Sequence, residues 1–544
     1  MESLGSTLPG STPIKSLETN VSSSTIPTTD LSPGGTLAVF GEFHPDGRQA
    51  YDNAVKRFRE ANIVLPTFAQ LRDPSTMPPS VRGQLATVDK DAADSRNLFR
   101  VHWFNAHADA PRTGGLAGEP NYPGVVDVPD HIELPPELTG VEARIVLAFG
   151  NRFPMIRAHK VLAAYSCLVA RLVTGRFDPT VGRAIWPSTG NYARGGVAIS
   201  KIMGCRGVAV LPEGMSRERF EWLDRWIEHP DDVIRTYGTE SNVKEIYDEC
   251  KRLALDPENI ILNQFSEFSN HMGHYGVTGP ALERVFRHIT AERSGRLAAF
   301  VSASGSAGTL GAGDHLKDSL GSRIVAVEAL ECPTMLYNGF GDHNIQGIGD
   351  KHIPLIHNVT NTDLVVAISD QSTDKLDVLF NSPAGHRLLA ERGVAEPVID
   401  VLVDMGYSSI CNTLAAITAA KKWGLGSDDV IVTVATDGSE LYNSEREKVM
   451  STHFSAGFDQ AEAAQVFEDH LANVEITHAL EMGETERNRV FNLGYFTWVE
   501  QQGIAIEDFE VRRNQSWWAG LRPLLDIWDD MIAEFNAATG AGHG

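Results

Sequence analysis

Short apolar segments alternate with segments of helical periodicity between about residues 143 and 442. Consecutive Val, Ile, Leu and Ala are typical of strands buried on both faces of a parallel sheet. We expect strands at residues 184–186, 207–211, 233–236, 260–263, 297–303, 323–328, 364–368 and 430–434. Helices are expected between them, at residues 192–203, 216–228, 242–253, 281–291, 309–319 and 408–423. This alternation predicts a doubly wound α/β fold, in which ligands bind beyond the carboxyl ends of the strands.

The flanking regions follow other patterns. The first 35 residues are rich in Ser, Thr, Pro and Gly, which predicts a disordered tail. An amphipathic helix is expected at residues 49–61, a Pro-rich connector at 123–136, and helices without a convincing strand at 454–538. We interpret the Trp-rich segment 515–518 and Trp528 as packing or dimer interface. The chain is therefore divided into a tail (1–35), an N-terminal extension (36–140), a core (141–445) and a helical C-terminal extension (446–544).

Charge and cysteine content narrow the function classes. The 544 residues include 47 Lys and Arg against 71 Asp and Glu, a net charge of −24. Such a chain repels phosphate backbones and anionic lipid, so we expect neither a nucleic-acid nor a membrane partner. The five cysteines have no CxxC spacing, no apolar run is long enough to span a membrane, and the N-terminus lacks a secretory pattern. A cytoplasmic protein is expected.

Three polar loops follow predicted strands. Pro187–Tyr192 combines two hydroxyls with the start of a helix, which suits a carboxylate, although the same residues also form ordinary turns and caps. Gly305–Gly313 is rich in glycine and carries two hydroxyls at a helix start, which suits a phosphate. It matches neither GxxxxGK[ST] nor GxGxxG, so an ATPase or a dinucleotide-dependent dehydrogenase is poorly supported. The third loop is Thr436–Tyr442, and Gly406–Ser409 opens the helix before it.

Lys160 begins an apolar helical segment. In such a setting desolvation favours a neutral amine and therefore Schiff-base chemistry. A single lysine is more often a surface charge, and only the three loops argue otherwise.

The loops, in this order, resemble those of the fold type II pyridoxal-phosphate enzymes, and most closely those of the cysteine synthase and cystathionine β-synthase branch. Lys160 precedes Asn191 by 31 residues, as in that family, and the likeness spans about residues 151–444. Further matching segments are 211–216, 263–265, 278–280, 325–328 and 345–349. The resemblance implies two mostly parallel α/β domains with the cofactor in the cleft between them, the smaller mobile one at about 165–275, and a homodimer.

Site roles are implied by the same resemblance. Lys160 would form the Schiff base with pyridoxal 5′-phosphate, and Asn191 would contact the 3′-oxygen of its ring. The cofactor phosphate would lie on Gly305, Ser306, Ala307, Gly308 and Thr309. The substrate and its carboxylate would be held by Ser188, Thr189, Gly190, Tyr192, Gln264 and Gly347.

Several positions depart from the family pattern. Relatives usually carry Gly where Ala307 stands. Where relatives have Ser before Gly at the pyridine nitrogen, this chain has Asp437-Gly438-Ser439, so Ser439 is our candidate, with Asp437 and Gly438 as alternatives. A hydroxyl partner would favour elimination over transamination, whereas an aspartate would reverse that conclusion.

Two further departures concern the substrate. Arg194 would either bind a second anionic group or face solvent. The segment 349–352 is more polar than in relatives, so we expect a different pocket for the leaving group or nucleophile.

We therefore expect a β-elimination or β-replacement on a small L-amino acid, through an aminoacrylate intermediate. Alternatives are a serine/threonine dehydratase or cysteine desulfhydrase, and a non-catalytic partner-binding scaffold of the same fold. No metal site is expected. His102, His107 and Asp109 have only loosely ligand-like spacing, and His271 and His274 were weighed as substrate contacts rather than ligands.

Overall fold

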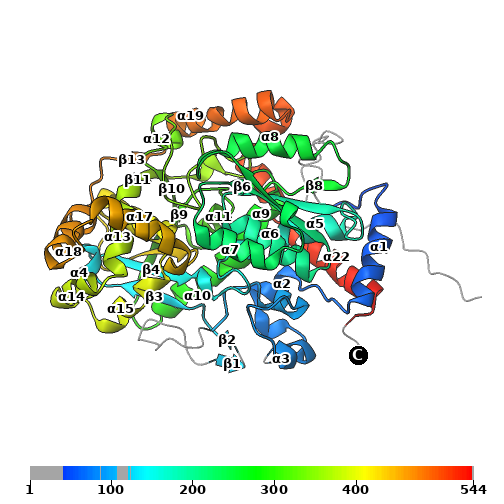
Figure 1. Cartoon of the computed structure of the whole chain (residues 1–544), viewed down its shortest axis with the longest axis horizontal. Helices are drawn as coiled ribbons and strands as arrows, with labels where there is room; N and C mark the ends of the chain where they lie inside the picture. The colour runs from blue at the N-terminus through cyan, green and yellow to red at the C-terminus, as the bar shows by residue number, and fades with distance from the viewer. Residues whose placement is uncertain (1–40, 86, 107–119, 123, 542–544) are drawn as a thin grey trace, which may run out of the picture.

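Two sheets with helices on both faces form the centre of the molecule (Figure 1). The computed structural model describes residues 41–85, 87–106, 120–122 and 124–541, so the predicted tail, His107 and Asp109 lie outside it. The large sheet has the strand order β13-β11-β10-β9-β12-β4-β3. Its strands are β3 (His131–Leu134), β4 (Arg144–Phe149), β9 (Arg296–Ala303), β10 (Arg323–Ala329), β11 (Leu364–Ile368), β12 (Asp429–Ala435) and β13 (Ala479–Glu481).

The inner strands of the large sheet are parallel, and its two edge strands, β3 and β13, are antiparallel. Both faces are buried: along β12, Val430, Val432 and Val434 belong to one hydrophobic cluster and Ile431 and Ala435 to the other. A continuous apolar strand is the consequence, because successive side chains point to opposite faces.

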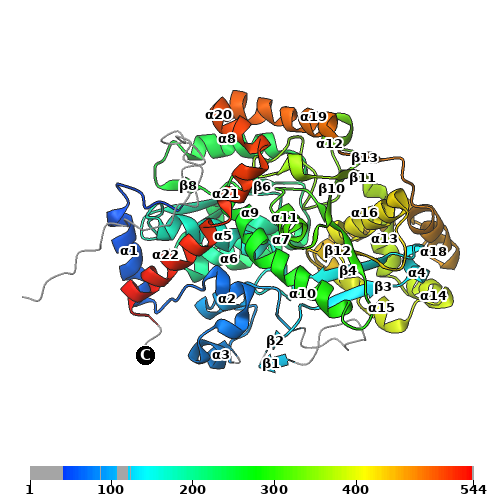
Figure 2. The ribbon, with the colours of Figure 1, turned by 180° about the vertical axis from the view of Figure 1, so that it is seen from behind.

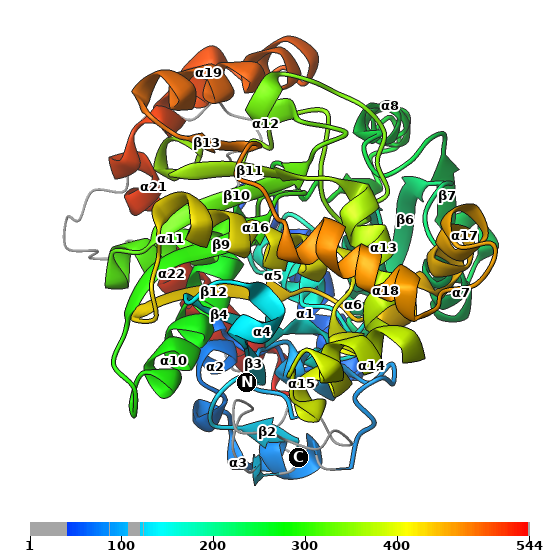
Figure 3. The same ribbon diagram turned by 90° about the vertical axis from the view of Figure 1, so that its left-hand side faces the viewer.

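The small sheet is parallel throughout, with the order β7-β6-β5-β8. Its strands are β5 (Arg183–Pro187), β6 (Arg206–Pro212), β7 (Val233–Thr236) and β8 (Asn259–Ile261). Ala184 and Trp186 pack in the cluster that includes residues of α6 (Asn191–Ile202), whereas Ile185 packs with Ile246 and Cys250 of α8 (Val243–Leu253). In Figure 3, α16 (Tyr407–Trp423) lies over the large sheet, where it packs on β9, β11 and β12, and α13 (Asp370–Phe380) packs on α16.

Helices cover the sheets and form most of the flanking regions. Before the first α/β unit lie α1 (Arg48–Glu60), α2 (Phe68–Arg72), α3 (Pro79–Leu85), the short hairpin β1 (Pro120–Tyr122) and β2 (Val125–Val126), and α4 (Pro136–Thr139). The α/β region contains α5 (Lys160–Val173), α6 (Asn191–Ile202), α7 (Arg217–Trp226), α8 (Val243–Leu253), α9 (Phe268–Gly273), α10 (Gly279–Ile289), α11 (Leu310–Leu320), α12 (Thr334–Tyr337), α13 (Asp370–Phe380), α14 (Pro383–Glu391), α15 (Glu396–Asp400) and α16 (Tyr407–Trp423). Beyond it lie α17 (Asn443–His453), α18 (Gln460–Phe467), α19 (Glu484–Tyr495), α20 (Ile506–Glu510), α21 (Gln515–Leu521) and α22 (Leu524–Thr539).

Helices from both flanking regions, α1 and α22, pack on α5, the helix that begins with Lys160. Helix α22 packs against both α1 and α5 (Figure 2). Phe535 contacts the rings of Phe58 and Tyr51, and the Asp529 carboxylate accepts hydrogen bonds from the backbone N–H groups of Phe68 and Ala69. The N-terminal and C-terminal extensions therefore support the same helix, α5.

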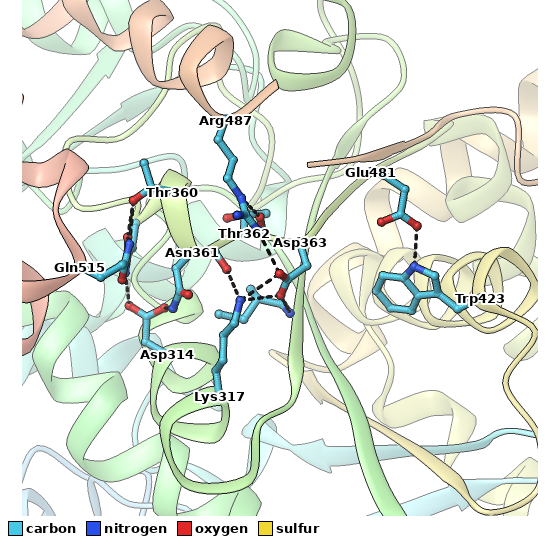
Figure 4. Close-up of polar contacts among 12 residues, drawn as sticks. Asp314, Lys317, Thr360, Asn361, Thr362, Asp363, Trp423, Glu481, Arg487 and Gln515 are labelled. Atoms are coloured by element: carbon cyan, nitrogen blue, oxygen red, sulfur yellow. Dashed lines mark hydrogen bonds and ion pairs between the residues drawn. The ribbon is translucent and has the colours of Figure 1, made fainter. Parts of the chain in front are cut away.

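A second set of contacts fixes the C-terminal region to the large domain (Figure 4). Arg487 of α19 and Lys317 of α11 both pair with Asp363, at 3.0 and 2.8 Å. Gln515 at the start of α21 donates to Thr360 at 2.7 Å, and Trp423 of α16 donates to Glu481 of β13. Trp517, Trp518 and Trp528 are buried within the chain, where they pack on Phe268 and Phe68.

The predicted α/β fold is confirmed, and every predicted strand is present within two residues of its expected ends. The expectation of no strand in residues 454–538 is wrong, because β13 pairs with β11 at the edge of the large sheet. Strand β3 lies inside the predicted N-terminal extension and pairs with β4. Among the described residues, no helix has the length and hydropathy that a membrane span needs. All five cysteines are free thiols.

Candidate active site

One pocket lies where the carboxyl ends of both sheets meet. Strand β5 leads into Ser188, β9 into the glycine loop, β12 into Thr436, and β4 into the segment that ends at Lys160. The pocket is lined by Lys160, Ser188, Thr189, Asn191, Tyr192, Gln264, Phe265, Ser302, Ala303, Gly305, Ser306, Ala307, Thr309, Gln346, Gly347, Ile348, Ser408, Asn412 and Thr436. Most of the site residues expected from the sequence are brought together here; Gly190, Gly308 and Ser439 are not part of this lining.

Lys160 is the sole cationic side chain in that lining. Its Nζ donates to Ser306 Oγ at 3.1 Å. Burial lowers the pKa of Lys160 to about 8, against the opposing effects of Asp350 and Glu240. An amine with such a pKa is partly neutral near pH 8 and is therefore a competent nucleophile and base.

The glycine loop forms one wall of the pocket. A Cβ on Gly308 would lie 2.2 Å from Asn270 Oδ1, and one on Gly305 would lie 2.7 Å from the Gly347 carbonyl oxygen, so both positions exclude a side chain. Ala307 has a φ of +65°, a left-handed conformation that is costly for any residue with a Cβ. The loop then enters α11, with the Ser306 and Thr309 hydroxyls on the pocket side.

A buried aromatic stack supports this wall from behind. His159 Nε2 lies 3.2 Å from Thr309 Oγ1, and its ring stacks on Trp103 at a centroid distance of 5.3 Å. The Trp103 indole in turn donates to Thr278 at 2.9 Å. Burial, together with Lys160, lowers the pKa of His159 to about 3, so this ring is neutral. Trp103 lies in the predicted N-terminal extension, which therefore reaches the back of the pocket.

The opposite wall is the loop between β5 and α6. Ser188 Oγ accepts from the Gly190 backbone N–H at 2.9 Å, and Gly190 has a φ of +148°. A Cβ on Gly190 would lie 2.8 Å from Arg219 Nε. Tyr192 donates to the Leu262 carbonyl at 3.0 Å, and Gln264 lies 3.4 Å from the Pro187 carbonyl. Hydroxyls and the first amides of α6 thus face the pocket, an arrangement that suits a carboxylate.

Asn191 is held in a buried network that joins α6 and α7 to the segment that follows β12. Its amide donates to Asp437 Oδ2 at 2.6 Å and accepts from Arg194 at 2.9 Å. Asp437 also accepts from the Tyr442 hydroxyl at 3.0 Å and lies 3.6 Å from Arg219. Burial raises the pKa of Asp437, against Arg219 and the hydrogen bond from Asn191. The Asn191 amide is thereby fixed in orientation.

Arg194 takes neither of the two roles expected from the sequence. It is 2% exposed, donates to Asn191 and to the Ile156 carbonyl, and lies over the Trp222 ring. It faces neither solvent nor the pocket, because α6 turns this position toward α7 and the segment before Lys160. We assign it the positioning of Asn191.

Ser439 is turned away from the pocket. Its hydroxyl donates to Asn381 at 2.8 Å, whereas Thr436, the first residue after β12, lines the pocket. The predicted loop contained Thr436, but the sequence did not show which of its positions faces inward. Gly438 packs against Glu440 and Asn151 instead.

Two carboxyls beside the pocket, those of Glu240 and Asp350, belong to no sequence motif that would have predicted them. Glu240 is 1% exposed, and its carboxyl lies beside the Thr189 hydroxyl and the Gly347 backbone N–H. Asp350 follows Gly349 in the polar segment 349–352, and its carboxyl interacts electrostatically with Lys160. The polar character of residues 349–352 was the sole sequence signal for Asp350.

Of the histidines considered as metal ligands or substrate contacts, the three that the structure describes, His102, His271 and His274, are buried among protein groups. His271 is buried against Trp518, 3.4 Å from Asp314, and His274 lies 2.9 Å from the Thr278 hydroxyl. His102 is fully buried and accepts from the Phe104 backbone N–H. In the described part of the chain, no three His, Cys, Asp or Glu side chains gather as a metal site would need.

Comparison with known proteins agrees with this geometry. Residues 149–377 match the family described as pyridoxal-phosphate dependent enzyme. Cysteine synthase B of Campylobacter jejuni is 30% identical over 49% of this chain and 79% of its own length. A probable cysteine synthase of Bacillus subtilis is 29% identical over 52% and 83%. A hydrogen sulfide-producing enzyme of Fusobacterium nucleatum has the same fold, with a TM-score of 0.50 and 22% identity over 65% of this chain and 96% of its own.

The residues present fit that cofactor. The loop at 305–309 excludes side chains at Gly305 and Gly308, and its Ser306 and Thr309 line the pocket, as a phosphate site requires. One amine of lowered pKa lies in the lining, and the Asn191 amide keeps one N–H free of Asp437 for a ring oxygen. The chain therefore belongs to the family of pyridoxal-phosphate-dependent enzymes, and pyridoxal 5′-phosphate is its cofactor.

Proposed function

We propose that the protein catalyses a β-elimination or β-replacement on a small L-amino acid that bears a leaving group on Cβ. The observation that carries this proposal is the position of the Lys160 amine between two anion-binding walls, one suited to a phosphate and one to a carboxylate. The cysteine synthase relatives support the same reaction class.

Each wall has an assigned ligand in this proposal. Lys160 would hold the cofactor through its amine, and the backbone and hydroxyls of Gly305, Ser306, Ala307, Gly308 and Thr309 would hold its phosphate. Asn191 would contact the 3′-oxygen, and Thr436 would meet the pyridine nitrogen in place of Ser439. Ser188, Thr189, Gly190 and Gln264 would hold the substrate carboxylate, with Tyr192 and Gly347 bounding the substrate.

The bound cofactor supplies a sink for negative charge that develops at Cα. The chain's own residues do the rest: the Ser188–Asn191 loop orients the substrate, and the Lys160 amine removes the Cα proton. Thr436 would place a hydroxyl at the pyridine nitrogen, and a hydroxyl partner would favour elimination of a β-substituent over transamination.

Product analysis tests this function. The purified holoenzyme is incubated with L-serine, L-cysteine or O-acetyl-L-serine, with and without sulfide, and keto acid and cysteine are measured. We expect at least one substrate to give keto acid or a β-replacement product, and Lys160→Ala to abolish that product. A wild-type holoenzyme that carries cofactor but only transaminates or racemises these substrates would overturn the proposal.

Location and assembly are also proposed here. Five free thiols are consistent with a reducing, cytoplasmic compartment. A homodimer is expected, as the family resemblance implies. Light scattering on the purified protein measures its mass, and a monomer at micromolar concentration would contradict the dimer.

A further inference from the structure

Two buried carboxyls beside the pocket lack the hydrogen bonds that buried acids normally make. Glu240 is 1% exposed and Asp350 is 6% exposed. Among the described residues, neither Glu240 oxygen has a hydrogen-bond partner of good geometry, and Asp350 Oδ2 has none. A buried carboxyl without partners is costly, so its retention calls for an explanation outside folding.

Both acids lie outside the pocket lining and interact with residues that form it. The Glu240 carboxyl is next to the Thr189 hydroxyl and the Gly347 backbone N–H, and both of these residues line the pocket. Asp350 follows Gly349 and interacts electrostatically with both Glu240 and Lys160. The two acids therefore adjoin the place where the substrate carboxylate loop and the Lys160 amine meet.

Burial keeps a proton on this pair near neutral pH. It raises the pKa of Asp350 to about 8, with Lys160 opposing, and raises that of Glu240 well above its ordinary value, with Thr189 and Arg219 opposing. Asp350 also raises the pKa of Glu240, because two neighbouring carboxyls resist joint ionisation. The other titratable groups that face Asp350 are Tyr247 and Cys332.

Leaving groups differ in their need for such a proton. Acetate and chloride depart as weakly basic anions. A thiolate is the base of an acid with a pKa of about 8.5, and hydroxide is far more basic, so both depart well only when protonated. General acid catalysis of this kind contributes about 10²- to 10⁴-fold.

We propose that the Glu240–Asp350 pair is the general acid that protonates the departing β-substituent, so that the natural substrate bears a hydroxyl, thiol or amine leaving group rather than an acyl ester. The inference rests on the proposed function and narrows its substrate class. The Cα proton goes to the Lys160 amine, and the Cα–H electron pair forms the Cα–Cβ double bond. The bond from Cβ to the substituent breaks with its electron pair on the substituent, which takes the proton of the pair. The proton on Lys160 then restores the pair.

The test compares leaving groups in matched variants. Glu240→Gln and Asp350→Asn holoenzymes are assayed for kcat/KM of keto-acid formation from L-serine and L-cysteine, and from β-chloro-L-alanine and O-acetyl-L-serine. Glu328→Gln is the control, since Glu328 is also buried with a pKa raised by burial to about 8, but its carboxylate accepts hydrogen bonds from the backbone N–H groups of Met335 and Leu336. We expect at least a 100-fold loss on serine and cysteine and less than a 3-fold loss on chloroalanine, with no such difference in the control.

Equal losses on both kinds of substrate would overturn the proposal, as would a wild-type enzyme that accepts O-acetylserine but neither serine nor cysteine. That second outcome leaves the proposed function intact, whereas a holoenzyme inactive on all four substrates would refute the function itself. If the variants fail to fold, the wild-type pH profile decides. The ratio of serine to chloroalanine turnover should fall with rising pH as the pair ionises, and a constant ratio would contradict the proposal.

Discussion

The pocket is flanked by two sets of buried acids that differ in how they are satisfied. Asp437 accepts hydrogen bonds from Asn191 and Tyr442 and lies 3.6 Å from Arg219. Glu240 and Asp350 are as deeply buried, yet the oxygens of Glu240 have no hydrogen-bond partner of good geometry among the described residues. The hydrogen bonds of the Asp437 carboxylate are thus made within the protein, whereas those of the Glu240–Asp350 pair are incomplete.

The difference separates structure from chemistry. A complete buried network fixes side chains and joins the domains, so its loss is felt in folding and in cofactor binding. An incomplete one weakens the fold, and proteins keep such groups where activity depends on them. Replacements in the two sets should therefore change stability in opposite directions.

The largest expected effect is on the complete network. Asp437→Ala leaves the Arg219 guanidinium without its carboxylate and frees the Asn191 amide, which should cost about 3–5 kcal/mol. The midpoint of urea unfolding measures the loss. Asp52→Ala is the control, because this exposed partner of Arg48 should cost less than about 1 kcal/mol. An unchanged midpoint for Asp437→Ala would show that the network does not stabilise the domains.

The opposite sign is expected at the incomplete pair. Asp350→Asn removes a carboxyl that folding forces to take up a proton, so the variant should be more stable than wild type at pH 8 by several kcal/mol. The same unfolding measurement applies, with the activity on serine lost. A less stable variant would mean that Asp350 is satisfied in the folded protein.

The pH dependence sharpens this result. The pKa of Asp350 is about 8 in the fold, above its ordinary value of 3.8, so wild-type stability rises as pH falls from 8 toward 4. The advantage of Asp350→Asn should shrink over that interval by up to about 1.4 kcal/mol per pH unit. Unfolding midpoints of wild type and Asp350→Asn are measured at pH 8, 7 and 6. The difference between the two proteins removes the contribution of the other buried acids, because both proteins contain them. A difference independent of pH would contradict the raised pKa.

The smallest expected effect concerns the loop at 305–309, which forms the phosphate-binding wall. A substitution there tests backbone strain and does not involve the buried acids. Ala307 has a φ of +65°, and Ala307→Gly should stabilise the protein by about 1 kcal/mol, because glycine adopts this conformation without a Cβ clash. Gly424→Ala, at a φ of +57° with no atom near its Cβ, should lose a similar amount. A thermal melt measures both, and a less stable Ala307→Gly would show that the loop is not strained.

Much of the fold was predictable because the central strands are buried on both faces. Strand β12 and its neighbours have an apolar residue at almost every position, which marks them in the sequence. Strands β3 and β13 are short edge strands of three or four residues, and their side chains alternate too briefly to be recognised.

The site was predictable where motifs are local and not where contacts are distant in sequence. Lys160, Asn191 and the 305–309 loop each sit in a recognisable segment, and the fold brings them to one pocket. Arg194 was misread because the direction of a helix face depends on its neighbours. Glu240 is 80 residues from Lys160 in the sequence, and only the tertiary structure places its carboxyl behind Thr189.

The central claim is that Lys160 carries the cofactor in this pocket. Reduction of the holoenzyme with borohydride fixes an imine-bound cofactor to its lysine, and peptide mapping by mass spectrometry then locates it. We predict a phosphopyridoxyl group on the peptide that contains Lys160 and none in Lys160→Ala. A label on another lysine, or cofactor bound without any reducible linkage, would contradict the assignment of this pocket as the active site.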